Sequence, residues 1–241
     1  MSSVLLFTLL TLLTGNPLLA LLALVVVWWL GDRATFRVLP DPFRWVVRWR
    51  RRAQLRRTLE VNPSDRRARL ELGDLLLEAR RPAEAVEVLR FNVEAGDDDV
   101  HTAFLWGTAQ GRSGQAAQAE RALAVARAAE PGFRAGEIDL ELGRQRLARG
   151  DASGAKVALE ALLALRPGTV EGRWYLVRAL TRLGDTAGAA RRRDEGWAEY
   201  LALPRFQRRA QRGYAWRLKP ARPAIWALGL ALLLCLVLWR C

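Results

Sequence analysis

The chain contains few of the residues on which catalytic and metal-binding sites most often depend. His101 is its only histidine, and its two cysteines, Cys235 and Cys241, lie six residues apart. Two such cysteines do not form a disulfide framework. A site of His and Cys metal ligands, a Ser-His-Asp triad and a Cys-His pair are excluded unless they depend on that single imidazole. We therefore predict a protein that is not an enzyme and that has no cofactor, metal or catalytic residue.

Lysine is also scarce, since only two of the 38 basic residues are Lys, yet the formal net charge is +13. Residues 31–62 contain nine Arg and three acidic residues, and residues 205–241 contain eight basic residues and no acidic one. Residues 63–204 are nearly balanced, with 21 basic and 22 acidic residues. Because the excess positive charge is confined to two flanks, these flanks are candidates for binding anionic lipid or nucleic acid.

Polar residues are almost absent from two segments of the chain. In the first, residues 4–30, the only polar residues are three Thr and Asn16, which follows Gly15 and precedes Pro17. As a helix this segment is long enough to cross a hydrocarbon core of about 30 Å. Asn16 and Pro17 are typical of a helix start. Two shapes fit the segment, a single kinked transmembrane helix, which we favour, and a re-entrant hairpin of two helices.

The second apolar segment, residues 224–239, has no polar side chain over 16 residues. It is short for a transmembrane helix, but Lys219 and Arg222 can extend it by placing their charged groups at the headgroup level. Seven of the ten Trp lie in or beside the two apolar segments, and an indole suits a membrane interface. The predicted interface residues are Trp28, Trp29, Trp45, Trp49, Trp216, Trp226 and Trp239.

The basic flanks also predict an orientation. Both border residues 31–222, and Lys and Arg concentrate on the cytoplasmic side of membranes. We therefore predict a location in the bacterial inner (cytoplasmic) membrane, with the middle of the chain facing the cytoplasm. Membrane lipids are the expected partners of the flanks. Nucleic acid is disfavoured because each Arg-rich run adjoins an apolar segment.

The middle of the chain repeats itself. Alanines recur at intervals of 34, 36 and 34 residues, at Ala85, Ala119, Ala155 and Ala189. Twelve residues before the first three alanines lie Gly73, Gly107 and Gly143, and four residues after them lie Leu89, Leu123 and Leu159. A glycine inside a helix costs about 1 kcal/mol relative to alanine, so these glycines predict the close approach of a neighbouring helix. Gly114, Gly150 and Gly184 recur in phase and predict turns with a positive φ.

This pattern resembles the tetratricopeptide repeat (TPR) family, whose unit is a pair of antiparallel helices of about 34 residues. The resemblance covers residues 66–204, and the fourth copy departs from it with Val177 and Arg193 at the Gly and Leu positions. The predicted fold is all-α, a TPR-like α-solenoid of about four helix-pair repeats flanked by N- and C-terminal transmembrane helices. Residues 52–63 are predicted to form an additional helix before the first repeat, and residues 191–203 to cap the other end.

The predicted organisation has five segments. They are an N-terminal membrane segment (residues 1–31), a basic amphipathic region beside the membrane (32–62), the TPR-like repeat domain (63–204), a basic linker (205–222) and a C-terminal transmembrane helix (223–241).

The resemblance implies a partner-binding groove, because in the TPR family the first helices of the repeats line the inner face of a curved stack. The implied groove residues are Leu70, Asp74, Phe104, Arg112, Leu140, Arg144, Trp174, Arg178 and Arg182. Aromatic and Arg side chains carry much of the energy of protein interfaces, and guanidinium groups suit a peptide with acidic groups. Some TPR proteins clamp a C-terminal carboxylate with Lys and Asn, but Leu70 and Asp74 occupy those places here.

We therefore predict a membrane-anchored scaffold or assembly factor that binds other proteins through this groove. Two other functions remain open, an accessory subunit of a larger inner-membrane complex, and a binder of anionic lipid or nucleic acid that uses the Arg-rich flanks. A structural interpretation also remains open, in which the groove residues are ordinary solvated helix faces and Trp174 fills the core between repeats.

Overall fold

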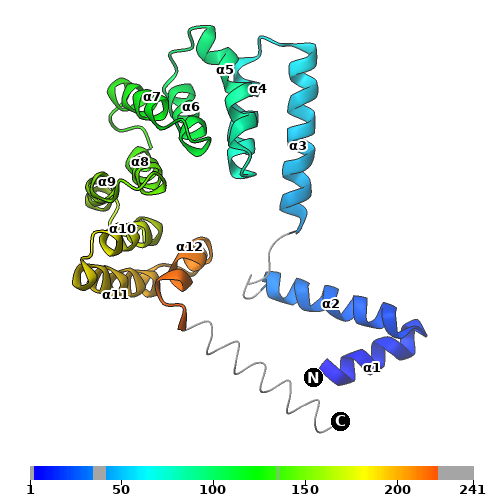
Figure 1. The fold of residues 1–241 in the computed structure, drawn as a ribbon. Helices are drawn as coiled ribbons and strands as arrows, with labels where there is room; N and C mark the ends of the chain where they lie inside the picture. Colours follow the sequence, from blue (N-terminus) through cyan, green and yellow to red (C-terminus); the bar gives the residue numbers. More distant parts are fainter. Residues whose placement is uncertain (1–2, 35–41, 135, 222–241) are drawn as a thin grey trace. The chain divides into compact units, whose positions relative to one another are not determined.

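The computed structural model describes residues 3–34, 42–134 and 136–221. These residues form α-helices and no strand (Figure 1), which confirms the predicted all-α class for this part of the chain. The chain divides into two compact units, residues 1–51 and residues 52–241, and the boundary falls within α3. The helices are α1 (Ser3–Thr14), α2 (Pro17–Ala34), α3 (Pro42–Val61), α4 (Arg66–Glu78), α5 (Pro82–Glu94), α6 (Val100–Arg112), α7 (Ala116–Ala129), α8 (Glu137–Ala148), α9 (Ala152–Leu165), α10 (Val170–Arg182), α11 (Thr186–Ala202) and α12 (Arg205–Leu218).

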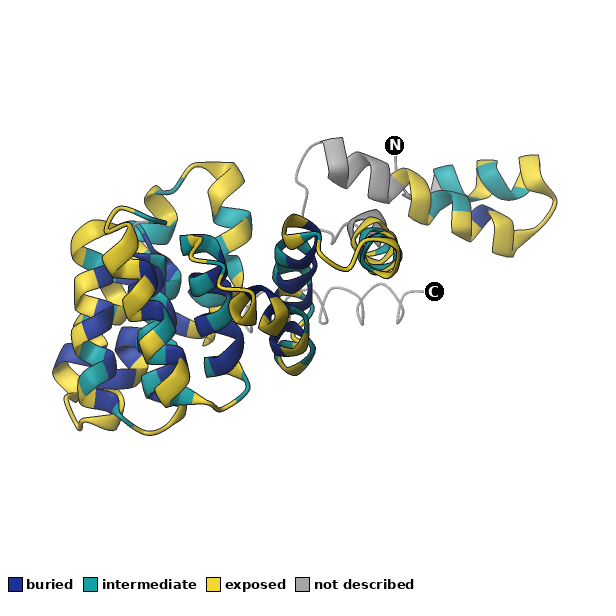
Figure 2. Cartoon of the chain, turned by 90° about the horizontal axis from the view of Figure 1, so that it is seen from above, coloured by how far each residue is buried: buried dark blue, intermediate teal, exposed yellow. Residues whose placement is uncertain are grey.

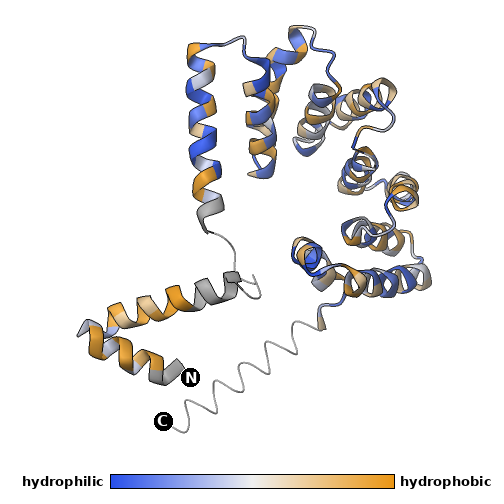
Figure 3. Cartoon of the chain, turned by 180° about the vertical axis from the view of Figure 1, so that it is seen from behind, coloured by the Kyte–Doolittle hydropathy of each residue, from blue (hydrophilic) through white to orange (hydrophobic). Residues whose placement is uncertain are grey.

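The first unit contains two apolar helices, which Figure 3 shows as largely hydrophobic. α1 ends at Thr14, and the next residue, Gly15, has a φ of +63°, a left-handed conformation that glycine adopts easily. Asn16 precedes α2 and caps it, because its side chain accepts a hydrogen bond from the Leu18 N–H at 2.9 Å. The two helices pack against each other, and Ala20 is fully buried. Residues 4–30 therefore form two separate helices rather than the single kinked helix favoured from the sequence.

No helix among the described residues is both long and apolar enough to cross a membrane. α1 has only 12 residues, and the 18 residues of α2 end in Gly31-Asp32-Arg33-Ala34. A membrane span needs about 20 mostly apolar residues. This finding contradicts the predicted location in a bacterial inner membrane, and the predicted N-terminal transmembrane helix is unsupported. The predicted C-terminal transmembrane helix, residues 223–241, lies outside the described residues.

The second unit contains the four predicted helix pairs, α4–α5, α6–α7, α8–α9 and α10–α11. We call α4, α6, α8 and α10 the first helices and α5, α7, α9 and α11 the second helices. Consecutive first helices contact one another, α4 with α6, α6 with α8 and α8 with α10. In Figure 1 the first helices lie on the inner side of this succession and the second helices on the outer side. The predicted TPR-like α-solenoid of four repeats is confirmed.

Three glycines allow the helices of a pair to approach closely. A Cβ atom at Gly73, Gly107 or Gly143 would lie 2.9, 2.8 or 2.6 Å from the nearest leucine side-chain atom of the paired second helix. These contacts come from Leu89, Leu123 and Leu159. Close approach at these glycines was predicted from the sequence, and the structure shows that the leucine of each repeat fills the space that the missing side chain leaves.

The turns inside the pairs follow the sequence pattern in three cases of four. Gly114, Gly150 and Gly184 have φ values of +92°, +93° and +78°. The first pair instead places Arg80 in the left-handed region with a φ of +59°, which the sequence did not predict. After the later turns, aspartates begin the second helices. Asp151 accepts a hydrogen bond from the Gly154 N–H at 2.8 Å, and Asp185 accepts one from the Gly188 N–H at 2.7 Å.

Buried side chains form two clusters that run through the repeats, and Figure 2 shows the buried positions between the helices. The first cluster extends from Leu55 of α3 to Ile138 of α8, and the second extends from Leu147 of α8 to Leu218 of α12. Each fully buried Leu contributes about 1.5–3 kcal/mol to stability, so the repeat domain is held mainly by contacts between neighbouring helices.

The two ends of the solenoid are covered by additional helices. At the start, Leu55 of α3 is buried in the first cluster, and Arg56 forms a 3.1 Å ion pair with Glu84. At the other end, α12 packs against α10 and α11 and buries Ala215 and Leu218. From the sequence, residues 205–222 were predicted to be a linker and residues 191–203 to be the cap. In the structure α11 contains residues 191–202, and α12 is the helix that covers them.

Candidate functional site

All nine predicted groove residues lie on the first helices. Leu70 and Asp74 are on α4, Phe104 and Arg112 on α6, Leu140 and Arg144 on α8, and Trp174, Arg178 and Arg182 on α10. The structure therefore brings them onto one succession of contacting helices. Five of them line two pockets, one between α4 and α6 and one where α6, α8 and α10 meet.

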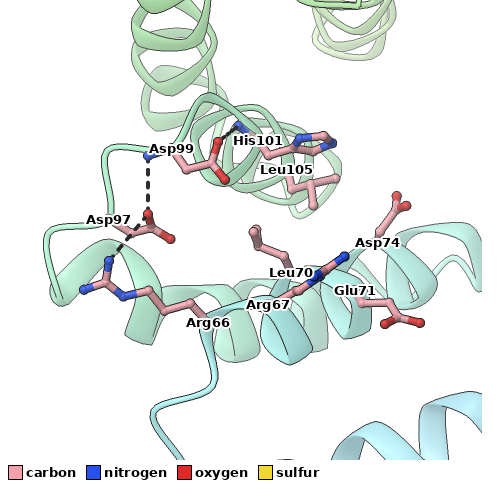
Figure 4. Close-up of a pocket in the computed structure, with 9 residues that line it drawn as sticks. All are labelled: Arg66, Arg67, Leu70, Glu71, Asp74, Asp97, Asp99, His101 and Leu105. Carbon is pink, nitrogen blue, oxygen red and sulfur yellow. Dashed lines mark hydrogen bonds and ion pairs between the residues drawn. The ribbon is translucent and has the colours of Figure 1, made fainter.

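The α4–α6 pocket has a volume of about 700 Å³. Figure 4 shows Leu70 of α4 and Leu105 of α6 on facing sides of it. Its walls carry more carboxylates than guanidinium groups, which gives the pocket a negative formal charge. The lining residues are Arg66, Arg67, Leu70, Glu71, Asp74, Asp97, Asp99, His101 and Leu105.

Two carboxylates of the α4–α6 pocket support the local fold. Asp97 accepts a hydrogen bond from the Thr102 hydroxyl at 2.8 Å and lies 3.9 Å from the Arg66 guanidinium. Asp99 caps α6 by accepting a hydrogen bond from the His101 N–H at 3.0 Å. Asp74 has no ion pair with another described residue, so its carboxylate remains available to a ligand.

Phe104 contributes to the core more than to a groove surface. Its exposed fraction is 7%, and its ring centroid lies 5.8 Å from that of Phe133. The Arg134 guanidinium lies 5.2 Å from the Phe104 ring, and an Arg134 nitrogen lies 2.8 Å from Nε2 of His101. Phe133 and Arg134 belong to the connection between α7 and α8, within the one repeat interval that has 36 residues instead of 34, so this contact was not predictable from the repeat pattern.

The α6–α10 pocket, with a volume of about 310 Å³, is built around a buried carboxylate. Glu141 is 4% exposed and accepts two hydrogen bonds from Arg112, at 3.3 and 3.0 Å. Its carboxylate also lies 3.4 Å from Arg144 and accepts a 3.3 Å hydrogen bond from the Gln145 amide. The lining residues are Gly111, Arg112, Glu141, Arg144, Gln145, Leu147, Ala148, Tyr175 and Arg178.

Three guanidinium groups and one carboxylate leave this pocket with a positive formal charge. Burial opposes the charge on Arg144, but the combined attraction of Glu141 and the neighbouring Tyr175, Glu171 and Tyr214 outweighs it and leaves the pKa of Arg144 raised above its usual value. Arg178 is exposed and forms no ion pair with a described residue. Its guanidinium instead lies 4.9 Å from the centre of the Trp174 ring.

Trp174 belongs to an aromatic cluster that joins α10 to α12. Its ring centroid lies 4.6 Å from that of Tyr175 and 5.6 Å from that of Tyr214. The Tyr214 hydroxyl donates a 2.6 Å hydrogen bond to Glu171. Burial, followed by this hydrogen bond, raises the pKa of Tyr214 above its usual value. Trp174 therefore partly fills the core between elements, and α12 covers part of the predicted groove on α10.

The remaining predicted residues have structural contacts or lie at the surface. Leu140 packs against the second buried cluster, and Arg182 donates a hydrogen bond to the carbonyl oxygen of Leu147. Trp45 and Trp49 on α3 are 68% and 55% exposed, and Trp216 on α12 is 44% exposed. The side chains of Trp28 and Trp29, and all of Trp226 and Trp239, lie outside the described residues.

Three polar residues of the α6–α10 pocket were not among the predicted groove residues, namely Glu141, Gln145 and Tyr175. They come from two different helices and meet only after the helices pack. Each lies one position after a predicted groove residue, and a single sequence does not indicate that such positions on different repeats share a pocket.

No protein-family model matches the chain, and no curated protein matches it. Solved structures do resemble it. Two crystal structures of MamA match with a TM-score of 0.53 and 19% identity, covering 61% of this chain and 85% and 80% of theirs. At this identity the likeness concerns the fold alone. TTC0263, a thermophilic TPR protein in Thermus thermophilus, matches with a TM-score of 0.46 and 21% identity, covering 76% of this chain and 89% of that one.

The helix pairs, their glycine and leucine contacts and their turns define the class of protein. In the part of the chain that the structure describes, the regular structure is all helical and includes a TPR-like solenoid. Such a fold presents a row of first helices to one side.

Proposed function

We propose that the protein is a non-catalytic scaffold or assembly factor that binds a segment of a partner protein along its first helices. The observation that supports this most strongly is the position of the two pockets. Both are lined by side chains from consecutive first helices, and they share α6. We expect a segment in extended or helical conformation to contact both pockets.

The chemistry of the two pockets also supports binding rather than a purely structural role. Asp74 and Arg178 are charged groups with no ion pair to a described residue, and they lie in pockets that also contain Leu70 and Leu147. Apolar anchors beside charged groups are the usual composition of a protein-binding surface. The two pockets have opposite formal charges, which would fix the direction of a bound segment.

Site-specific photocrosslinking tests this proposal. A photoreactive amino acid is placed in the full chain at Asp74 or Arg178 on first helices, and at Arg121, an exposed position of the second helix α7, as the control. We expect one protein to be captured in cells at both inner positions and not at the control. That protein, once purified, should then bind the purified chain. Equal capture at Arg121, or no capture at Asp74 and Arg178, would contradict the groove.

A further inference from the structure

The α6–α10 pocket has more positive charge than its own carboxylate neutralises. Glu141 accepts two hydrogen bonds from Arg112, so this pair is satisfied within the protein. Arg144 shares the same carboxylate at the longer distance of 3.4 Å, and Arg178 has no ion pair with a described residue. Two guanidinium groups at one pocket therefore have donor N–H groups to spare.

A second observation in the same pocket points to a ligand. Gln145 is 6% exposed, and its amide nitrogen donates to the Gly107 carbonyl and to Glu141, both at 3.3 Å. Its carbonyl oxygen Oε1 is buried and has no hydrogen-bond donor among the described residues. A buried acceptor without a donor is destabilising, so a ligand N–H at this place would be favourable.

The Gln145 side chain packs against α6 at a glycine. A Cβ atom at Gly111 of α6 would lie 2.0 Å from the Gln145 amide, so only glycine allows the amide its present place. The donors of Arg144 and Arg178 and the acceptor of Gln145 thus occur together in one pocket.

We propose that this pocket binds the carboxylate of an Asp or Glu side chain within a segment of the partner protein. Arg144 and Arg178 donate to the carboxylate, and a backbone N–H of the segment donates to Oε1 of Gln145. This inference rests on the proposed function. A side chain is specified rather than a chain terminus because contacting first helices continue on both sides of α8. A carboxylate is specified rather than a phosphate because Glu141 in the pocket repels a dianion more strongly.

Selection of binding segments tests the proposal. Random peptide segments are displayed inside a carrier protein, so that neither end is free, and are selected on the full chain. We expect Asp or Glu to be enriched at one position. A synthetic segment of the selected sequence, with both ends capped, is then measured by fluorescence anisotropy. Arg178→Gln and Arg144→Gln should each weaken binding about tenfold, the loss of a charge-assisted hydrogen bond.

A matched control and a double-mutant cycle make the result specific. Arg191→Gln, which removes one exposed positive charge from α11, should leave the affinity unchanged. Replacing the acidic residue of the segment by its amide should weaken binding to the wild-type chain. The same replacement should change the affinity of the Arg178→Gln variant very little. Unfolding curves establish that each variant is folded, and Arg178 has no ion pair with a described residue whose loss would affect folding.

The outcomes separate this inference from the function on which it rests. Selected segments with no acidic preference, or with an affinity that Arg178→Gln does not change, would overturn the inference and leave the binding groove intact. Binding that requires a free C-terminal carboxylate or a phosphorylated residue would overturn the inference in the same way. Failure to select any segment would overturn both.

Discussion

At the residue scale, a side chain that is absent matters as much as those that are present. Gly143 allows Leu159 to lie where a Cβ atom would be 2.6 Å away, and Gly107 does the same for Leu123. The recurrence of Gly and Leu at a fixed spacing was visible in the sequence, because each of these repeats packs its two helices through the same Gly–Leu contact. The role of Gly111 was not visible, because its neighbour Gln145 comes from another repeat.

Two glycine substitutions should therefore have opposite effects. Gly143→Ala places a methyl group against Leu159 and should lower the free energy of unfolding by about 1–3 kcal/mol, despite the better helix propensity of Ala. Gly213→Ala in α12, where the new Cβ would meet no atom within 4 Å beyond its own stretch of helix, should raise the free energy of unfolding by up to about 1 kcal/mol. Urea unfolding of the full chain measures both. Stabilisation by Gly143→Ala would contradict the close helix contact.

At the element scale, capping residues and end helices determine where the repeats begin and end. Asp151 and Asp185 follow turn glycines, so the sequence indicated both the turns and the caps. It did not indicate that residues 205–218 form α12, because this segment is rich in Arg and buries only Ala215 and Leu218. The sequence of a helix that buries so few apolar residues looks like that of a basic linker. Its packing against α10 and α11 becomes evident only in the structure.

The cap of α9 should make stability depend on pH in the acid range. A hydrogen bond from the Gly154 N–H, followed by one from Ser153, lowers the pKa of Asp151. The ionised Asp151 carboxylate therefore contributes to the stability of the fold above the pKa of about 3.9 that it has in the unfolded chain. This contribution is lost as the pH falls through the lower pKa that it has in the folded chain. Asp151→Asn retains an acceptor but does not titrate. Its unfolding midpoint in urea should fall less on acidification than that of the wild type. An identical dependence on pH would count against the cap.

One short hydrogen bond joins α12 to the last repeat, in addition to the packing of Ala215 and Leu218. The Tyr214 hydroxyl donates to Glu171 at 2.6 Å, and Tyr214→Phe removes this donor while keeping the ring. We expect the free energy of unfolding to fall by about 1 kcal/mol and the backbone amides of α12 to exchange faster with deuterium. Tyr200→Phe in α11 is the matched control, and equal effects of the two substitutions would contradict the assignment.

At the scale of the whole molecule, the sequence predicted the repeat domain well and the location wrongly. Four helix pairs follow from periodic Gly, Ala and Leu, a signal that recurs along the chain and therefore does not depend on any single residue. Residues 4–30 were predicted to form a transmembrane helix because they were treated as one continuous apolar segment. The positive φ of Gly15 and the cap at Asn16 break that segment into helices of 12 and 18 residues.

The candidate site was predicted in outline and not in detail. The family resemblance placed the nine groove residues on first helices, where they lie. The division into two pockets of opposite formal charge, and the burial of Phe104, arise from contacts between repeats that a single sequence does not specify.

The central claim is that a partner protein binds along the first helices, and hydroxyl-radical footprinting of the complex tests it most directly. The chain is labelled with and without the purified partner identified by crosslinking. We predict that Leu70, Trp174 and Tyr175 on first helices become protected. Phe91 and Leu165 on second helices, which are 52% and 61% exposed, should be labelled equally in both states. Protection of Phe91 and Leu165 with unchanged labelling of Leu70, Trp174 and Tyr175 would contradict the claim.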